Sequence, residues 1–237
     1  MYNYQAPKRR RGLKTLIWVA VVLVLLVGLD FGAKAFAENA AAGQLQKRGF
    51  PSKPNVSISG FPFLTQVITR HFQQITITSS NIPAGPLKIT SLTVVADNVH
   101  LSGSFQSGTA GPLHGTIVIS LGSIGSALGS AGPLATFVAG GSKSLVIKAV
   151  GSTEVKGNLS LVGGLVSGSA IWQVSRAGPA EIKLHKVSSS GVFSNLPSDI
   201  TLPVSSLPAG LTLSGGLNAS ASGITANVYA KSVAFGP

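Results

Sequence analysis

A basic cluster followed by an uncharged apolar run near the N-terminus constrains the whole chain. Five basic residues precede the run, namely Lys8, Arg9, Arg10, Arg11 and Lys14. The run extends from Thr15 to Leu29 and ends at Asp30. Such a pattern is typical of exported proteins, and its basic side stays in the cytoplasm. The sequence therefore predicts a cytoplasmic basic tail plus a signal peptide or membrane anchor over residues 1–34, and an exported domain over residues 35–237.

The length of the apolar run leaves two interpretations open. Its 15 residues are fewer than the ~20 of a typical membrane span and suit the core of a signal peptide. Ala35-Phe36-Ala37 offers a small-x-small site at which a signal peptidase could cut. Alternatively, residues 30–48 look helical and could continue the apolar helix outward without a break, as an uncleaved anchor. Both interpretations export the domain.

Composition excludes several classes of site and narrows the partners. The chain has no cysteine, which excludes disulfides, a thiol nucleophile and a cysteine zinc site. Residues 1–34 hold six basic residues and one acid (net +5), and residues 35–237 hold twelve and five (net +7). Because the basic residues of the second part are scattered, apart from Lys47-Arg48, they do not resemble a nucleic-acid patch. We expect an anionic lipid or glycan and a membrane surface as partners, although the charge can also serve solubility alone.

Alternating apolar residues predict an α+β domain built on one large, twisted, mainly antiparallel sheet. The alternating groups are Val56/Ile58, Ile75/Ile77, Leu87/Ile89, Leu92/Val94, Val99/Leu101, Ile117/Ile119/Leu121, Ile182/Leu184 and Leu211/Leu213. Helices are predicted over residues 30–48, with Gly49 as the stop, and from Pro62 to about His71. One or two weak helices are predicted within residues 122–141. Turns are predicted at residues 81–86, 108–112 and 188–191.

Residues suited to catalysis or metal binding are few and do not form a recognisable motif. The four histidines, His71, His100, His114 and His185, lie in separate segments without metal-ligand spacing. Nothing in the sequence pairs Asp97, Glu154, Glu181 and Asp199 as the two carboxylates of a glycosidase. No serine lies in a G-x-S-x-G motif, and residues 140–144 (GGSKS) lack the glycines of a phosphate loop. We therefore expect no enzymatic activity, no metal and no cofactor.

The segment from residue 56 to residue 68 carries the densest apolar group in the exported part. Two interpretations remain open: the short helix is anchored in the core, or it lines the mouth of a lipid groove. In the second interpretation the candidate lipid-binding residues are Phe61, Pro62, Phe63, Leu64, Val67, Ile68, Phe72, Leu207 and Leu211. The candidate head-group residues are Arg70, His71 and Lys88, because a guanidinium offers a phosphate a planar fork of donors.

Two parts of the sequence resemble a known family. Residues 59–66 read S-G-F-P-F-L-T-Q, after the strand V-S-I-S. Near the end of the chain come Leu202-Pro203, the stretch L-P-A-G-L at 207–211 and G-I-T-A-N-V-Y at 223–229. These motifs are similar to those of the LmeA-like phospholipid-binding family of the actinobacterial cell envelope. One departure is that Thr69 precedes Arg70, where the family usually has a Gly-Arg pair.

The resemblance implies a fold and a function. The implied fold is an elongated α+β structure in which a strongly curved sheet wraps a long N-terminal helix, similar to half of a tubular lipid-binding (TULIP-like) fold. The implied function is non-enzymatic binding of anionic phospholipids such as phosphatidylinositol, in support of lipoglycan or envelope biogenesis; transfer of the lipid is left open. The alternative is a wall-associated structural or interaction protein with no lipid ligand. The resemblance supplies no map of binding residues, so the candidate residues above are physical inferences.

Overall fold

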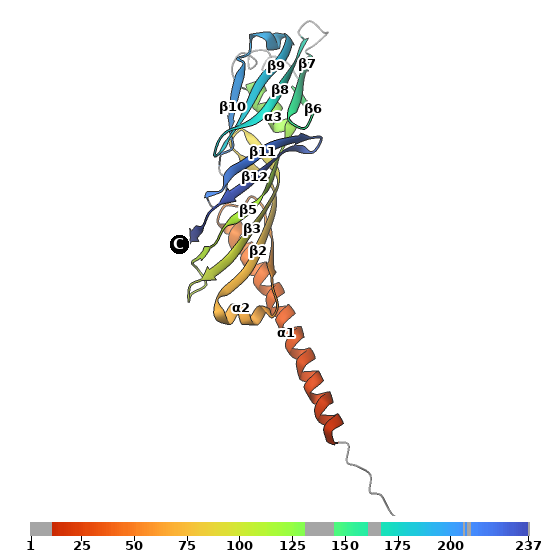
Figure 1. Ribbon diagram of the computed structural model, residues 1–237, viewed down its shortest axis with the longest axis vertical. Coiled ribbons are helices and arrows are strands. Elements are labelled where there is room, and N and C mark those ends of the chain that lie inside the picture. Colours follow the sequence, from red (N-terminus) through yellow and green to blue (C-terminus); the bar gives the residue numbers. More distant parts are fainter. Residues whose placement is uncertain (1–10, 131–144, 161–166, 206, 208–209, 237) are drawn as a thin grey trace, which may run out of the picture.

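The computed structural model describes residues 11–130, 145–160, 167–205, 207 and 210–236. Its first element is one continuous helix, α1 (Arg11–Lys47), whose N-terminal part projects from one end of the domain (Figure 1). Leucine and alanine favour this helix, and it ends just before Gly49, which adopts φ 113°. The helix predicted over residues 30–48 is confirmed, and it continues the apolar run without a break.

The larger of two sheets has eight strands and packs against α1 through its edge strand β1. Its main path runs in the order β1-β2-β3-β5-β12-β11, and β4 pairs with both β3 and β13. The strands are β1 (Asn55–Ser59), β2 (His71–Ala84), β3 (Leu87–Leu101), β4 (Gly108–Ala110), β5 (Leu113–Ile119), β11 (Thr212–Ser220), β12 (Gly223–Ala230) and β13 (Val233–Phe235). The short helix α2 (Phe63–Thr69) lies across the lower end of this sheet, where α1 leaves the domain (Figure 1).

A second sheet of five strands forms the opposite end of the molecule. Its order is β10-β9-β8-β7-β6, with bounds β6 (Val146–Ala149), β7 (Glu154–Ser160), β8 (Ser167–Gly178), β9 (Glu181–Gly191) and β10 (Asp199–Pro203). The helix α3 (Leu121–Ser130) and the 3₁₀ turn η2 (Val192–Asn195) accompany it. Trp172 and Phe193 fill its core edge to face, with ring centroids 5.6 Å apart. The two sheets are joined where Arg176 donates a hydrogen bond to the carbonyl of Leu213 (2.8 Å).

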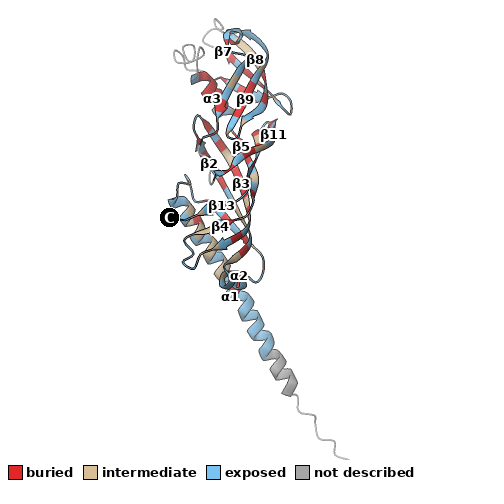
Figure 2. Ribbon diagram, turned by 60° about the vertical axis from the view of Figure 1, so that its left-hand side comes forward, coloured by how far each residue is buried: buried red, intermediate tan, exposed pale blue. Residues whose placement is uncertain are grey.

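One face of the eight-stranded sheet is apolar from edge to edge. Strand register places Val56, Ile77, Val94, Gly115, Val228 and Leu213 in one row that crosses six strands. The row below it begins with Ile58 and Ile75 and continues through Ala96, Leu113 and Ala230. These rows arise because every second side chain of a strand points to the same face. Figure 2 shows the resulting buried stripes along the strands, in contrast to the exposed part of α1 from residue 18 to residue 29.

The α+β class, the long N-terminal helix and the antiparallel strands are confirmed. Every strand pairing among the described residues is antiparallel. The prediction of one large sheet is wrong, because the strands divide into two sheets. Period-two alternation identifies a strand and its buried face, but it does not identify the strand's neighbours.

The predicted turns differ from the structure in three places. Of residues 108–112, the first three form β4, which pairs with β3 and β13. Within residues 81–86 the chain reverses only at Gly85-Pro86, since Asn81 adopts a left-handed φ of 56° inside β2 while the ladder to β3 continues on both sides of it. Residues 188–191 extend β9 to Gly191, because their pairing with β8 overrides the turn preference of serine. Of the weak helices predicted within residues 122–141, the first is confirmed as α3, although it already begins at Leu121. Helix α3 ends at Ser130. Residues 131–141, where a second weak helix was predicted, and the rejected phosphate-loop segment 140–144 lie outside the described residues.

Ion pairing on the surface of the second sheet connects β9 with β10. The carboxylate of Asp199 accepts a hydrogen bond from the ring of His185 (2.7 Å). It also forms an ion pair with the ammonium of Lys183 (2.9 Å). The imidazole and then the ammonium hold the pKa of Asp199 below its ordinary value. This acid is engaged in a surface contact between two strands, on a solvent-exposed strand face.

Candidate functional site

The junction of α1 with α2 is organised by a buried carboxylate. Asp30 of α1 is only 4% exposed, and its two oxygens accept hydrogen bonds from the backbone N–H groups of Phe63 (2.9 Å) and Leu64 (2.7 Å). The first amides of any helix lack partners within that helix, and the residue before α2, Pro62, offers no side-chain cap. Asp30 therefore acts as the N-terminal cap of α2 from a helix 33 residues earlier in the sequence.

The following three turns of α1 also belong to the fold of the domain. The carboxylate of Glu38 accepts a hydrogen bond from the backbone N–H of Ile58 in β1 (2.7 Å). Ala42 is buried, and Ala33 and Ala37 pack against the same core. The expected boundary between residues 34 and 35 thus falls in the middle of a helix that packs on both sides of it.

Helix α2 has a core face and an exposed face. Phe63 is 2% exposed and packs against Phe72 with ring centroids 6.1 Å apart, while Val67 is half-buried. Ile68 is 81% exposed and Phe61 is 63% exposed, and Leu64 and Pro62 are also exposed. Phe63 and Phe72 therefore anchor the segment in the core, as the first interpretation expects, and Phe61, Leu64 and Ile68 face outward. The role of this segment at the mouth of a lipid groove stays a prediction.

The structure does not gather the remaining candidate lipid-binding residues beside α2. Leu211 is buried directly before β11, the edge strand on the side of the sheet opposite to β1. Leu207 is half-buried against the core in the segment before it. Both residues contribute to the packing of the sheet at a distance from the short helix.

The three candidate head-group residues are also separated. Arg70 caps the C-terminal end of α2 in a left-handed conformation (φ 56°), and His71 opens β2 beside it. Lys88 pairs with Pro83 at the far end of the β2–β3 hairpin, about 40 Å away at the usual rise of a strand. One phosphate cannot contact both ends.

His71 has a partner that the sequence did not reveal. It lies opposite His100 in the β2–β3 ladder, and the two rings stack with centroids 4.2 Å apart. The Nε2 atom of His71 is buried and has no hydrogen-bond partner among the described residues. Only strand register brings these residues together, since they are far apart in the chain.

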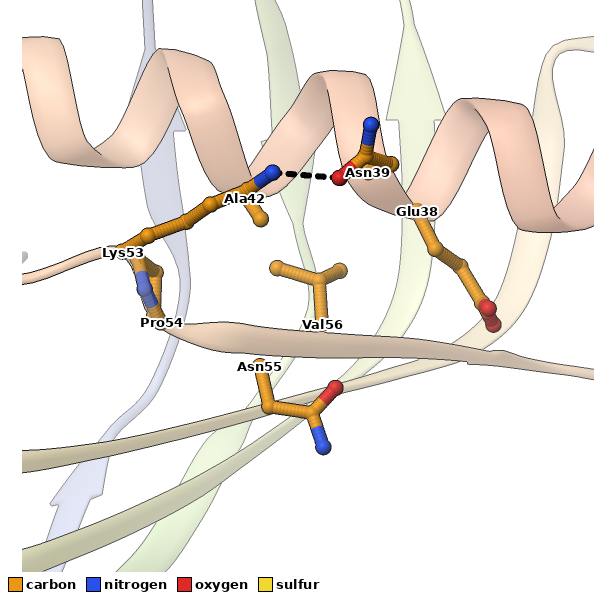
Figure 3. Close-up of a pocket in the computed structure, with 7 residues that line it drawn as sticks. All are labelled: Glu38, Asn39, Ala42, Lys53, Pro54, Asn55 and Val56. Atoms are coloured by element: carbon orange, nitrogen blue, oxygen red, sulfur yellow. Dashed lines mark hydrogen bonds between the residues drawn. The ribbon is translucent and has the colours of Figure 1, made fainter.

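A cleft between α1 and the edge strand β1 was not predicted from sequence (Figure 3). It is a cavity of about 370 Å³ lined by Glu38, Asn39, Ala42, Lys53, Pro54, Asn55 and Val56. Ala42 and Val56 are buried and give it an apolar floor, while the ammonium of exposed Lys53 reaches across the cleft to the side-chain oxygen of Asn39. Val56 also begins the apolar row that crosses the sheet, so the cleft adjoins the apolar face.

These features define a class of molecule: an α+β domain built directly on a helix that is long and apolar enough to cross a membrane. The family is identified by comparison with family models. The chain matches the model of the LmeA-like phospholipid-binding family over residues 28–228 and belongs to that family. No curated protein matches the chain, and no solved structure matches it. The likeness to half of a tubular lipid-binding fold therefore stays a prediction.

Proposed function

We propose that this protein is anchored on the outer side of the cytoplasmic membrane by α1 and binds an anionic phospholipid, such as phosphatidylinositol, without catalysing a reaction. Membership of a phospholipid-binding family over residues 28–228 is the observation that carries the lipid assignment. In this proposal the protein serves envelope or lipoglycan biogenesis by presenting or transferring that lipid.

The cleft between α1 and β1 is the binding site that the geometry favours. Its volume of about 370 Å³ lies within the range of small-molecule sites. An acyl chain that entered over Ala42 and Val56 would meet the apolar rows of the sheet, and each buried methylene would contribute about 0.8 kcal/mol. Lys53 stands at the rim as the cation for the phosphate, where a charge-assisted hydrogen bond keeps the head group outside.

The charge of the chain supports an anionic partner. Residues 35–237 carry a net charge of +7, from twelve basic residues and five acids. Each basic residue near an anionic leaflet contributes about 1 kcal/mol of attraction. Arg70 is exposed at the end of the domain from which α1 projects, where such a leaflet would lie.

The packing of α1 favours an uncleaved anchor over a signal peptide. A cut after Ala37 would remove Asp30, and with it the cap of α2. It would also remove Ala33 and Ala37 from the core. We expect the intact mass of the protein isolated from membranes to include residues 1–37, measured by mass spectrometry after detergent extraction. A mature chain that begins at residue 38 would contradict the anchor.

Lipid binding is tested by native mass spectrometry of the full chain, purified in a mild detergent from vesicles with equal amounts of phosphatidylinositol and phosphatidylcholine. We expect a single phosphatidylinositol adduct. Lys53→Glu reverses the charge at the rim and should reduce that adduct about tenfold, because a charge-assisted hydrogen bond contributes ~1.5–3 kcal/mol.

Lys148→Glu is the matched control, since Lys148 is an exposed lysine in β6 of the other sheet and its substitution changes the net charge equally. It should leave the adduct unchanged. If both variants lose the adduct equally, the net charge of the chain rather than the cleft determines lipid binding. A wild-type chain that retains neither lipid would contradict the proposed function and favour a structural protein of the cell wall.

A further inference from the structure

We propose that the exposed face of α2, together with Phe31 of α1, inserts into the outer leaflet of the membrane and fixes the orientation of the domain on the bilayer. We call this surface the α2 foot and define it by Phe31, Phe61, Leu64 and Ile68. The inference rests on the retained anchor proposed above and assigns a second membrane contact to it.

The foot is apolar and exposed, and no other part of the chain that the structure describes covers it. Phe61 is 63% exposed, Ile68 is 81% exposed and Phe31 is 60% exposed. The rings of Phe31 and Phe61 lie 6.3 Å apart, so they join α1 and α2 into one surface. Helix α2 has only seven residues and is held by its core face. Exposure of such large apolar side chains to water is unfavourable in free energy. Exposed aromatic and aliphatic side chains of this kind are typical of helices that lie in a membrane interface.

The position of the foot along α1 identifies the bilayer as its partner. The apolar run from Thr15 to Leu29 ends at Asp30, whose carboxylate binds the first amides of α2. The foot therefore lies at the level where the membrane span ends, and α2 lies across α1 at that level (Figure 1). Exposed apolar residues continue along α1 from the span to the foot, since Leu29 is 64% exposed and Phe31 is 60% exposed.

The length of the span supports the same conclusion. Its 15 residues rise only about 22 Å as a helix, whereas the hydrocarbon core is about 30 Å thick. The next turn of α1 must therefore approach the acyl region. Asp30 is compatible with that depth because it is buried and both of its oxygens are hydrogen-bonded, and the foot supplies apolar surface around it.

The absence of cysteine from the chain permits a direct measurement of depth. Two single-cysteine variants are labelled with an environment-sensitive fluorophore: Ile68→Cys in the foot and Val187→Cys in β9. Val187 is 55% exposed and lies in the distant sheet. The full-length variants are reconstituted in vesicles of phosphatidylcholine and phosphatidylglycerol. Quenching is then compared between aqueous iodide and lipids that carry a nitroxide near the head group, and vesicle flotation reports the anchor.

We expect the label at residue 68 to be quenched by the nitroxide lipid and to be about threefold or more less accessible to iodide than the label at residue 187. Flotation with equal iodide quenching at both positions would overturn the foot while the anchor stands. A chain that does not float with the vesicles would overturn the foot and the anchor together. Phospholipid adducts are measured separately, so failure of the foot and failure of lipid binding are distinguishable.

Discussion

Replacement of Asp30 by alanine is expected to release α2 from α1. The change removes both acceptors of the Phe63 and Leu64 amides at a site that is only 4% exposed. Hydrogen bonds to a charged group contribute about 1.5–3 kcal/mol each, so the loss is about 3 kcal/mol or more. Exchange of these two amides with solvent deuterium should accelerate by about 100-fold, since each 1.4 kcal/mol corresponds to tenfold. The measurement is hydrogen exchange of the full chain in detergent micelles.

Asp30→Asn is the matched control for this prediction. It keeps one carbonyl oxygen as an acceptor and removes the charge, so its effect on exchange should fall between those of wild type and alanine. Amides in β8, which belongs to the other sheet, should exchange at the wild-type rate in both variants. Unchanged protection of Phe63 and Leu64 in Asp30→Ala would show that the core face of α2, rather than the cap, holds the helix.

The role of Asp30 illustrates what sequence reasoning could not supply. The sequence shows a single acid at the end of the apolar run, which reads naturally as the residue that terminates a signal core. Its partners lie 33 residues or more away in the chain, and helix capping is recognised from sequence only when the cap directly precedes its helix. One signal in the sequence did point to a distant cap. Pro62 cannot cap α2 with its side chain, so the first amides of α2 need an acceptor from elsewhere in the chain.

Most of the secondary structure was accessible from periodicity, but the assembly of strands was not. Val56/Ile58 and Ile117/Ile119 do lie in strands with their side chains buried. The alternation at 87–89, 92–94 and 99–101 belongs to one long strand, β3, because a strand of 15 residues keeps its ladder through local irregularities. Division into two sheets depends on long-range pairing, which alternation does not encode.

The candidate site was predicted in part, for a similar reason. Apolar side chains at period 3.6 do not reveal which face of a short helix is buried, so Phe63 and Ile68 entered the same list although the structure places them on opposite faces. Lys53 and Asn39 were not singled out because neither belongs to a motif. Their proximity follows from the packing of α1 against β1, which the sequence does not specify.

Phe63→Asp is expected to destabilise the fold rather than to remove lipid binding alone. Phe63 is 2% exposed and packs on Phe72, so an aspartate there would lose the packing of the ring and place a carboxylate in an apolar site. Loss of a buried phenylalanine side chain alone costs about 3–5 kcal/mol. We expect a melting temperature about 10 °C lower or more, or a chain that does not accumulate in folded form. The probe is the fluorescence of Trp172, which is fully buried in the other sheet, measured in a chain whose exposed Trp18 is replaced by phenylalanine.

Ile68→Asp on the same helix separates a structural effect from a functional one. Ile68 is 81% exposed, so this variant adds the same charge and should keep the wild-type melting temperature. Phe63→Leu is the conservative companion, and it should cost less stability than Phe63→Asp, because the site stays apolar and only the part of the ring that leucine does not fill is lost. A stable Phe63→Asp protein that no longer retains phospholipid would show that Phe63 faces a lipid rather than the core. Destabilisation by Ile68→Asp in detergent would show instead that the exposed face of α2 supports the fold, so that its apolar character would no longer point to the membrane.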